Sequence, residues 1–320
     1  MMKLQLLQRQ PYSRLCTSLV KWPQLSSGGT CTILRGLSND ATTASSSVSP
    51  NEIAKFSEMH QQWWDPSFNP LISMNPSRIK YILDIVKKKM KQPNEITNNH
   101  HGKKHHPPLH NLTALDVGCG GGLLSESLAR LGANVTAVDP SQALVDMAQQ
   151  HAKHMGDPRL GKIDYRGGVT VEELAASAST NQQDPFDLVC LLEVLEHASD
   201  VPSLLQAATS LVKPNGGLLF VSTINRTWKS HLLTIVGAEY IMGYVPPGTH
   251  NWEQYLAPDE VTTMVQRFGM QPLDICGMVV SRPPFCGNWD WRLDARDTDC
   301  NWIAAYQYHD KALQSSKGAN

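Results

Sequence analysis

A run of glycines is the first feature of this sequence that could do chemistry. The segment from Asp116 to Gly122 reads DVGCGGG and lies between an apolar stretch and a leucine-rich one. Glycine lets the backbone turn sharply and approach a ligand without a Cβ in the way. A dinucleotide fingerprint needs the spacing G-x-G-x-x-G, whereas counting from Gly118 and Gly120 puts Leu123 at its last position. The spacing suits a ligand without a pyrophosphate, such as the methionine portion of S-adenosylmethionine.

Asp139 is the second candidate, 21 residues after Gly118 and directly after a predicted strand. An acidic side chain at that position can accept hydrogen bonds from both hydroxyls of a ribose, and a bond to a charged acceptor contributes about 1.5–3 kcal/mol. The simpler alternative is a glycine turn followed by an incidental aspartate. The glycine loop and the acid in this order predict a nucleoside-containing ligand held by Gly118, Gly120 and Asp139.

The third candidate is the segment EVLEH, which contains Glu193, Glu196 and His197. If this turn is helical, the three side chains are spaced i, i+3 and i+4 and project to one side. Two carboxylates and an imidazole could then hold a divalent ion that binds a phenolic oxygen and lowers its pKa. His197 could instead act as a general base. A third interpretation is structural, with acids that favour the helix dipole and a packed histidine.

The elements that must position these residues follow an α/β alternation. Gly118 comes after a predicted strand over 112–117, and Glu193 comes after one over 186–192. The hydrophobic pattern predicts further strands at 134–138, 163–166, 217–223, 273–280 and 302–308, and helices at 123–131, 143–154, 171–177, 201–212 and 258–268. Repeated strand–helix units predict a doubly wound, mostly parallel, seven-stranded Rossmann-like sheet that binds ligands at the carboxyl ends of its strands.

The composition excludes several classes of function. The 320 residues are 41% hydrophobic and 18% charged, which is enough apolar material for a sizeable core. The formal net charge of −1 lacks the basic surplus of a nucleic-acid-binding protein. No uncharged apolar stretch reaches the roughly 20 residues of a membrane-spanning helix. The seven cysteines are scattered without a C-x-x-C pair, so neither a disulfide framework nor a zinc site is indicated.

The first 49 residues differ in composition from the rest. Five lysines and arginines and no acidic residue precede Asp40, and a stretch rich in serine and threonine follows over 42–49. An acid-poor N-terminus with arginines and serines is typical of an organelle transit peptide. We expect residues 1–49 to be a disordered mitochondrial transit peptide, with a plastid address as the alternative. Residues 50–310 are expected to form the folded domain.

Three later segments interrupt the α/β alternation. Residues 87–110 hold six lysines, five histidines and one acid, and they predict a flexible loop rather than a metal-binding tract. Residues 228–247 are apolar apart from Lys229 and Glu239. The segment 228–250 is expected to form an apolar helical insertion that faces a membrane or covers an apolar pocket, with a buried core helix as the alternative. Residues 311–320 are expected to be a disordered tail.

Several longer motifs resemble the mitochondrial ubiquinone-biosynthesis O-methyltransferases over residues 52–261. They are IAKF at 53–56, WWD at 63–65, NPSR at 75–78, LDVGCGGGLLS at 115–125, EVLEH at 193–197, STINR at 222–226, GAEY at 237–240 and VPPGTH at 245–250. A generic methyltransferase would share only the glycine loop, whereas the GAEY and GTH elements are characteristic of this family. The chain is therefore similar to this family well beyond its cofactor motif.

The resemblance implies an enzyme that uses S-adenosylmethionine to methylate catechol hydroxyls of polyprenylated dihydroxybenzoate and demethylubiquinol. It also implies a peripheral position on the matrix side of the mitochondrial inner membrane, within a complex of other ubiquinone-biosynthesis proteins. The implied site residues are cofactor contacts at Arg78, Gly118, Asp139 and Leu192, catalytic roles for Glu193 and His197, and Mg²⁺ or another divalent cation on Glu193, Glu196 and His197.

Three other functions are compatible with the residues. One is a methyltransferase that acts on a different hydrophobic small molecule. Another is a non-catalytic scaffold that binds S-adenosylmethionine within the biosynthetic complex, although the intact glycine loop, Asp139 and EVLEH segment favour an active enzyme. A nicotinamide-dependent dehydrogenase is more distant, because the glycine spacing departs from the dinucleotide fingerprint.

Overall fold

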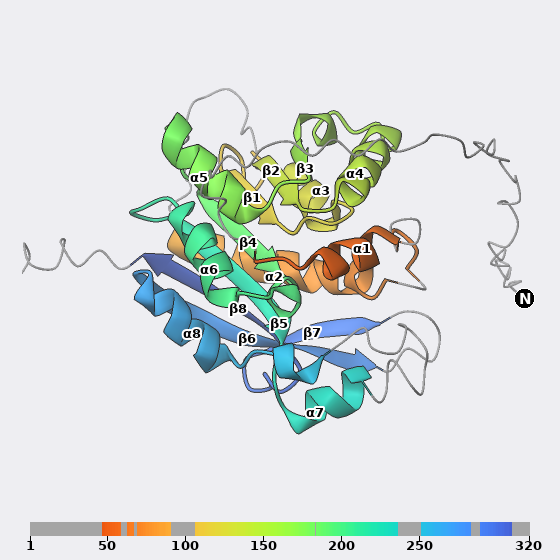
Figure 1. The fold of residues 1–320 in the computed structure, drawn as a ribbon, viewed down its shortest axis with the longest axis vertical. Coiled ribbons are helices and arrows are strands. Elements are labelled where there is room, and N and C mark those ends of the chain that lie inside the picture. The colour runs from red at the N-terminus through yellow and green to blue at the C-terminus, as the bar shows by residue number, and fades with distance from the viewer. Residues whose placement is uncertain are drawn as a thin grey trace, which may run out of the picture. The chain divides into compact units, whose positions relative to one another are not determined.

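A twisted sheet of eight strands forms the centre of the part of the chain that the structure describes (Figure 1). The computed structural model describes residues 47–58, 63–66, 69–90, 106–182, 184–235, 251–282 and 289–308. The strands are β1 Thr113–Val117, β2 Asn134–Asp139, β3 Asp164–Gly167, β4 Leu188–Leu192, β5 Leu218–Ile224, β6 Met270–Arg282, β7 Asp290–Asp294 and β8 Asn301–Tyr308, in the order β3-β2-β1-β4-β5-β8-β6-β7. Strands β1 to β5 are parallel and β6 to β8 antiparallel, which confirms the doubly wound, mostly parallel fold.

The expected number of seven strands is wrong by one, because β7 pairs with β6 at the edge of the sheet. This five-residue strand reads DWRLD, so a charged residue stands at every second position. Only Trp291 and Leu293 pack against the hydrophobic core, and such a short half-buried edge strand has a weak sequence signal. The added strand lies far from the β1 and β4 ends that carry the candidate residues.

Helices cover both faces of the sheet. They are α1 Pro50–Glu58, α2 Leu71–Lys89, α3 Leu123–Arg130, α4 Gln142–His154, α5 Val171–Asn181, α6 Val201–Ser210, the short α7 Trp228–Ser230 and α8 Pro258–Arg267, with 3₁₀ turns at Leu160–Lys162, Leu195–His197 and Trp252–Gln254. Side chains of α2, α3 and α4 pack on one face, and those of α5, α6 and α8 on the other. Each face of the sheet has its own hydrophobic core, and successive strand residues point to opposite faces. Cys190 packs into the core with α2, α3 and α4, and Val189 into the core with α5, α6 and α8.

Helix α2 was not expected from the hydrophobic pattern, and it carries Arg78. The three lysines at 87–89 form its last turn, where cations favour the helix dipole, so these residues do not belong to the loop expected over 87–110. Ser47 and Val48, expected in the leader, pack against the domain: Ser47 is buried, and Val48 forms a bridge with Ala198. The expectations for residues 1–46, 91–105, 236–250 and 311–320 lie outside the described residues.

Where the structure describes the chain, none of its helices has both the length and the apolar character needed to cross a bilayer. The described part of the apolar insertion consists of α7 and one further turn over 231–235, and it leads away from β5 (Figure 1). Helix α7 is capped by Thr227, whose hydroxyl accepts a hydrogen bond from the Ser230 amide at 3.1 Å. The described start of the segment after the fifth strand is therefore a capped helical turn.

Candidate active site

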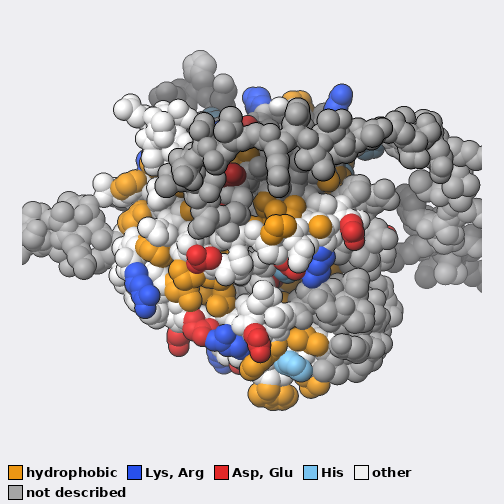
Figure 2. Space-filling model, viewed as in Figure 1, with side chains coloured by type: hydrophobic (Ala, Val, Ile, Leu, Met, Phe, Trp, Pro, Cys, Tyr) orange, Lys and Arg blue, Asp and Glu red, His pale blue; other side chains and the backbone are white. Residues whose placement is uncertain are grey.

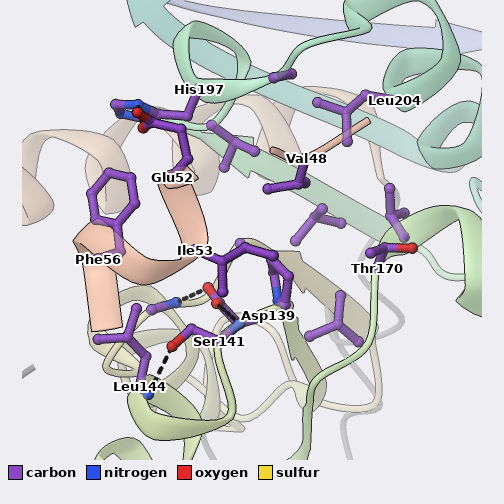
Figure 3. Close-up of a pocket in the computed structure, with 18 of the residues that line it drawn as sticks. Val48, Glu52, Ile53, Phe56, Asp139, Ser141, Leu144, Thr170, His197 and Leu204 are labelled. Carbon is purple, nitrogen blue, oxygen red and sulfur yellow. Dashed lines mark hydrogen bonds and ion pairs between the residues drawn. The ribbon is translucent and has the colours of Figure 1, made fainter. Parts of the chain in front are cut away.

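The pocket lies at the carboxyl ends of β1, β2 and β4, where the strand order reverses between β1 and β4. Open α/β sheets bind their ligands in the crevice at such a reversal. The pocket is lined by the loops that follow β1, β2, β3 and β4 and by side chains from α1 and its flanks (Figure 3); the latter are Val48, Glu52, Ile53, Phe56 and Trp63. Gly118, Gly120, Asp139, Glu193 and His197 all line it, together with apolar side chains.

The glycine loop has the backbone conformation that requires glycine. Gly118, Gly120 and Gly122 have φ angles of 67°, 51° and 84°, in the left-handed region that other residues rarely adopt. A Cβ on Gly118 would lie 2.7 Å from a methyl carbon of Val194, and one on Gly120 would collide with the Trp63 ring. The loop therefore needs glycine both for its turn and for the close approach of neighbouring groups.

Asp139 fixes the glycine loop against the end of β2. Its carboxylate accepts hydrogen bonds from the backbone amides of Gly120 and Ser141, both at 2.8 Å (Figure 3). Ser141 in turn caps α4 by accepting from the Leu144 amide at 3.4 Å. Burial raises the pKa of Asp139 to about 6, although both backbone bonds lower it. Each carboxylate oxygen keeps a second lone pair with which it can accept from a ligand hydroxyl.

Asp116 lies beneath the same loop and is not exposed to the pocket. Its carboxylate accepts a hydrogen bond from Ser125 Oγ at 2.5 Å, which ties the end of β1 to helix α3. Desolvation by burial raises the pKa of Asp116 to about 7, and the hydrogen bond from Ser125 opposes this change. The first acid of the DVGCGGG segment therefore supports the loop from behind.

Arg78 and Leu192 do not line the pocket, although Glu193, next to Leu192 in the chain, does. The Arg78 side chain is buried on α2, and its Nη2 lies 3.2 Å from Oε1 of Glu193. This contact is an ion pair without hydrogen-bond geometry, and Nε of Arg78 has no hydrogen-bond partner. Arg78 thus has donors to spare next to Glu193, and its cofactor contact stays a prediction.

The EVLEH segment does not form the single helical turn expected from its spacing. Glu193 has a φ of 59°, and only Leu195–His197 forms a 3₁₀ turn, so the five residues do not form one continuous helical turn. Glu193 accepts a hydrogen bond from Ser222 Oγ at 2.6 Å. Glu196 is buried and accepts one from Thr223 Oγ1 at 2.6 Å. The expected i, i+3, i+4 geometry is wrong because the chain turns sharply at the end of β4.

His197 is paired with a carboxylate from a distant part of the chain. Its Nδ1 lies 3.0 Å from Oε2 of Glu52 on α1, and the Phe56 ring stands edge-on to the imidazole at 4.7 Å (Figure 3). The hydrogen bond with His197 lowers the pKa of Glu52, so the carboxylate is ionised at neutral pH. A carboxylate on Nδ1 places the proton of the neutral ring there and leaves Nε2 as the basic nitrogen.

The donor set for a divalent ion is not assembled in this arrangement. Of the residues that the structure describes, no three His, Cys, Asp or Glu side chains form a group that could hold a metal ion. Glu193 faces the guanidinium of Arg78, and Glu196 is bonded to Thr223. A cation next to Glu193 would also meet the positive charge of Arg78. The residues as placed here do not fit a magnesium centre.

The N-terminal segment is the part of the site that sequence reasoning missed. Trp64 Nε1 donates to the carbonyl of Gly121 at 3.1 Å, and its ring stacks on His151 with the ring centres 3.6 Å apart. Ser57 Oγ lies 2.7 Å from Ser141 Oγ, so α1 is also held on the loop after β2. The WWD motif was visible in the sequence, but its spacing alone gave no reason to place it on the glycine loop.

Comparisons with known proteins identify the family. A family model described as a methyltransferase domain matches residues 90–275. The ubiquinone biosynthesis O-methyltransferase of Azorhizobium caulinodans is 40% identical over 263 residues, which cover 82% of this chain and 94% of the relative. That of Parvibaculum lavamentivorans is 41% identical over 265 residues, with the same two coverages. The chain belongs to the ubiquinone biosynthesis O-methyltransferase family.

As a member of this family, the chain is an S-adenosylmethionine-dependent O-methyltransferase, as the glycine loop and the longer motifs predict. Both of these relatives are bacterial, so the mitochondrial part of the resemblance stays a prediction. Among solved structures, the fold is similar to magnesium protoporphyrin IX methyltransferase of Synechocystis with bound S-adenosylhomocysteine, with a TM-score of 0.53 and 17% identity over 80% of this chain and 95% of that chain. It is also similar to the protein PH0226 of Pyrococcus horikoshii, with a TM-score of 0.50 and 13% identity over 80% and 99% of the two chains.

Proposed function

We propose that this enzyme methylates a catechol hydroxyl of polyprenylated ubiquinone precursors, both dihydroxybenzoate and demethylubiquinol intermediates. The observation that carries the proposal is the pocket in which Asp139 and the His197–Glu52 pair lie on the same lining. Such a pocket brings a nucleoside-binding acid and a candidate base together at the edge of the sheet. The bacterial relatives are named ubiquinone biosynthesis O-methyltransferases, which supports both a role in ubiquinone biosynthesis and methyl transfer to an oxygen atom.

The reaction is a direct displacement in which the chain's own residues bind, orient and move a proton. S-adenosylmethionine, when bound, supplies a methyl group that is attached to a positively charged sulfur. After the transfer, this sulfur is part of a neutral thioether. Asp139 and the glycine loop bind the donor, and the apolar lining excludes water from it. His197 Nε2 accepts the proton of the catechol hydroxyl, so the oxygen gains the electron pair that forms the new carbon–oxygen bond. Glu52 stabilises the imidazolium that results.

Mg²⁺ is implied by the resemblance alone. An ion that binds Glu193, Glu196 and His197 together would have to share Glu193 with the cationic Arg78 and Glu196 with Thr223, whereas His197 could bind through Nε2 and keep its bond to Glu52. No step of the mechanism is therefore assigned to a metal ion. Turnover that requires added Mg²⁺ in chelator-treated protein would show that these side chains rearrange around the ion.

The proposed function is tested by transfer of a labelled methyl group from S-adenosylmethionine to a short-chain prenyl catechol, with and without divalent ions. We expect label in the methyl ether only when the catechol carries a free hydroxyl. A methyltransferase of another hydrophobic small molecule would leave the prenyl catechol unlabelled. A non-catalytic scaffold would bind the donor and label no acceptor. Rescue of respiration in a ubiquinone-deficient cell would show that the natural acceptor belongs to ubiquinone biosynthesis.

We also propose that the enzyme docks peripherally on a membrane through the start of its insertion. Trp228 is 77% exposed, and Leu232 and Leu233 are each about half exposed. Figure 2 shows hydrophobic side chains gathered at the end of the molecule where α7 lies in Figure 1. Exposed tryptophan and leucine side chains on one short segment are suited to the interfacial region of a bilayer. A polyprenylated substrate is dissolved in that bilayer, so docking would bring the enzyme to it.

Replacing Trp228, Leu232 and Leu233 together by serine is expected to lower binding to lipid vesicles about 10- to 100-fold, because the apolar area available for burial is lost. The measurement is flotation with vesicles of phosphatidylcholine and an anionic lipid. The matched control is Met155→Ser, because Met155 is as exposed as the two leucines but follows α4, away from the insertion. Equal flotation of the triple variant and the unaltered protein would contradict the docking proposal.

The location that we propose is the matrix side of the mitochondrial inner membrane. The acid-poor composition of the first 49 residues supports import. The resemblance also supports assembly with other ubiquinone-biosynthesis proteins in a complex. Fusion of residues 1–49 to a fluorescent protein tests where this segment directs a protein. Fluorescence in plastids would contradict import into mitochondria.

A further inference from the structure

A short helix borders the pocket without being part of the hydrophobic core. Helix α1 and its flanks, residues 47–58 and 63–64, form what we call the strap. None of the side chains of α1 is buried, although Glu52, Ile53 and Phe56 line the pocket (Figure 3). A short helix that buries little apolar surface depends on contacts at its ends to stay in place. The strap is therefore an element that such contacts can hold or release.

The first end of the strap is held on the loop after β4. The carbonyl of Ser47 accepts hydrogen bonds from the Ser199 amide at 2.7 Å and from Ser199 Oγ at 2.8 Å. Val48, the next residue, forms an antiparallel bridge with Ala198. Pairing of this kind fixes the start of the strap, which can serve as its hinge.

The other end of the strap is held by Trp64. Its ring stacks on His151 of α4 with the ring centres 3.6 Å apart and the planes 7° from parallel, and its Nε1 donates to the Gly121 carbonyl at 3.1 Å. His151 is held in turn, because its Nδ1 lies 2.6 Å from Oε1 of Glu126. The Glu126 carboxylate is fully buried and also accepts from Arg130 at 2.8 Å. The imidazole is thus a fixed platform on which the aromatic end of the strap rests.

Between these two ends the strap contacts the groups that would bind and activate the ligands. Ser57 Oγ lies 2.7 Å from Ser141 Oγ, and the Ser141 amide donates to Asp139 at 2.8 Å. On the same helix, Glu52 is paired with His197 at 3.0 Å (Figure 3). A methyl donor that reaches from the ribose site at Asp139 toward His197 therefore lies against α1.

We propose that the Trp64–His151 stack is a latch that holds the strap closed over the bound donor and keeps Glu52 on His197 during methyl transfer. The inference rests on the proposed function, because it places S-adenosylmethionine in this pocket. Opening of the latch releases α1, so that the donor can exchange while Glu52 leaves the imidazole. Trp64 and His151 are positioning residues, because they act on the reaction through α1.

The test replaces Trp64 and measures the dissociation of radiolabelled S-adenosylhomocysteine during a chase with unlabelled ligand. Trp64→Leu removes the stack and leaves His151 bonded to Glu126, and we expect dissociation to become about 10-fold faster. Trp64→Phe keeps a ring on His151, so its dissociation rate should change less than about threefold. In Trp64→Leu saturated with ligand, the α1 amides should exchange hydrogen faster, and single-turnover methyl transfer should be about 3- to 10-fold slower.

A second variant breaks the same stack from the side of α4. His151→Ala should speed dissociation as Trp64→Leu does, and the two changes together should have no larger effect than either alone, because they remove one interaction. This variant keeps the inference testable if Trp64→Leu does not fold. Its control is His154→Ala, since His154 is exposed one turn further along α4.

The matched control for Trp64 is Trp252→Leu. Trp252 likewise donates its indole N–H to a backbone carbonyl and has a histidine ring, His231, beside it, but it does not line the pocket. Its replacement should leave both dissociation and α1 exchange unchanged.

Unchanged dissociation in Trp64→Leu and His151→Ala would overturn the inference. Faster dissociation with unchanged exchange of the α1 amides would also overturn it, since Trp64 would then act on the glycine loop alone. An unchanged single-turnover rate would refute the effect of the latch on Glu52. Failure of the unaltered protein to bind S-adenosylhomocysteine would instead count against the proposed function.

Discussion

Replacement of His197 by alanine is expected to lower kcat about 10²- to 10⁴-fold, the usual effect of losing a positioned general base. The imidazole is the candidate acceptor for the proton of the catechol, and its Nδ1 is held by Glu52 at 3.0 Å. Binding of the methyl donor should change little, because Asp139 and the glycine loop hold it. Steady-state kinetics with a short-chain prenyl catechol and calorimetry with S-adenosylhomocysteine measure the two effects separately.

The control for this prediction is His154→Ala, since His154 is exposed at the end of α4, outside the pocket lining. Glu52→Gln is a further variant, and it tests whether Glu52 positions His197 or only stabilises the fold. An amide at position 52 no longer stabilises an imidazolium, so the pH at which activity rises should fall while the protein stays folded. Full activity of His197→Ala would refute its role as the base. A pH profile unchanged in Glu52→Gln would refute the role of the pair.

Replacement of Asp139 by asparagine is expected to weaken the binding of S-adenosylmethionine about 10- to 100-fold. The carboxylate already accepts the amides of Gly120 and Ser141, so its removal also loosens the glycine loop. Direct titration of the donor by calorimetry measures the loss. The matched control is Asp146→Asn, because Asp146 is exposed on α4 and outside the pocket lining. Donor affinity unchanged in Asp139→Asn would contradict the assignment of the ribose site.

Donor affinity should also depend on pH through Asp139. Burial raises the pKa of Asp139 to about 6, so the free protein takes up a proton there as the pH falls through 6. The protonated acid is a weaker acceptor for ribose hydroxyls, and the affinity of the unaltered protein should therefore fall below pH 6. The step near pH 6 should disappear in Asp139→Asn, because the amide at position 139 does not titrate.

The alternation of strands and helices could be predicted from the sequence because its signals are local. Strand β4 is buried along its whole length and reads as a continuous apolar run, and α4 has its capping serine directly before it. The signal fails for α2, which carries a proline inside its 19 residues, and for β7, whose alternate residues are charged. Both elements are held by packing against residues far away in the chain, which no local pattern contains.

The site also combines features with a local sequence signal and contacts between distant parts of the chain. The glycine loop and Asp139 follow their strands directly, so motif spacing predicted a nucleoside-containing ligand at this place. The longer motifs gave the resemblance to a family of methyltransferases. The partner of His197 could not be read in this way, because Glu52 lies 145 residues earlier and meets it only when α1 packs on the pocket. Glu193, which adopts a left-handed backbone conformation, likewise departs from the helical spacing that its segment suggests. Tertiary structure decided these contacts, since the pairing of distant side chains depends on the packing of whole elements and not on their local sequence.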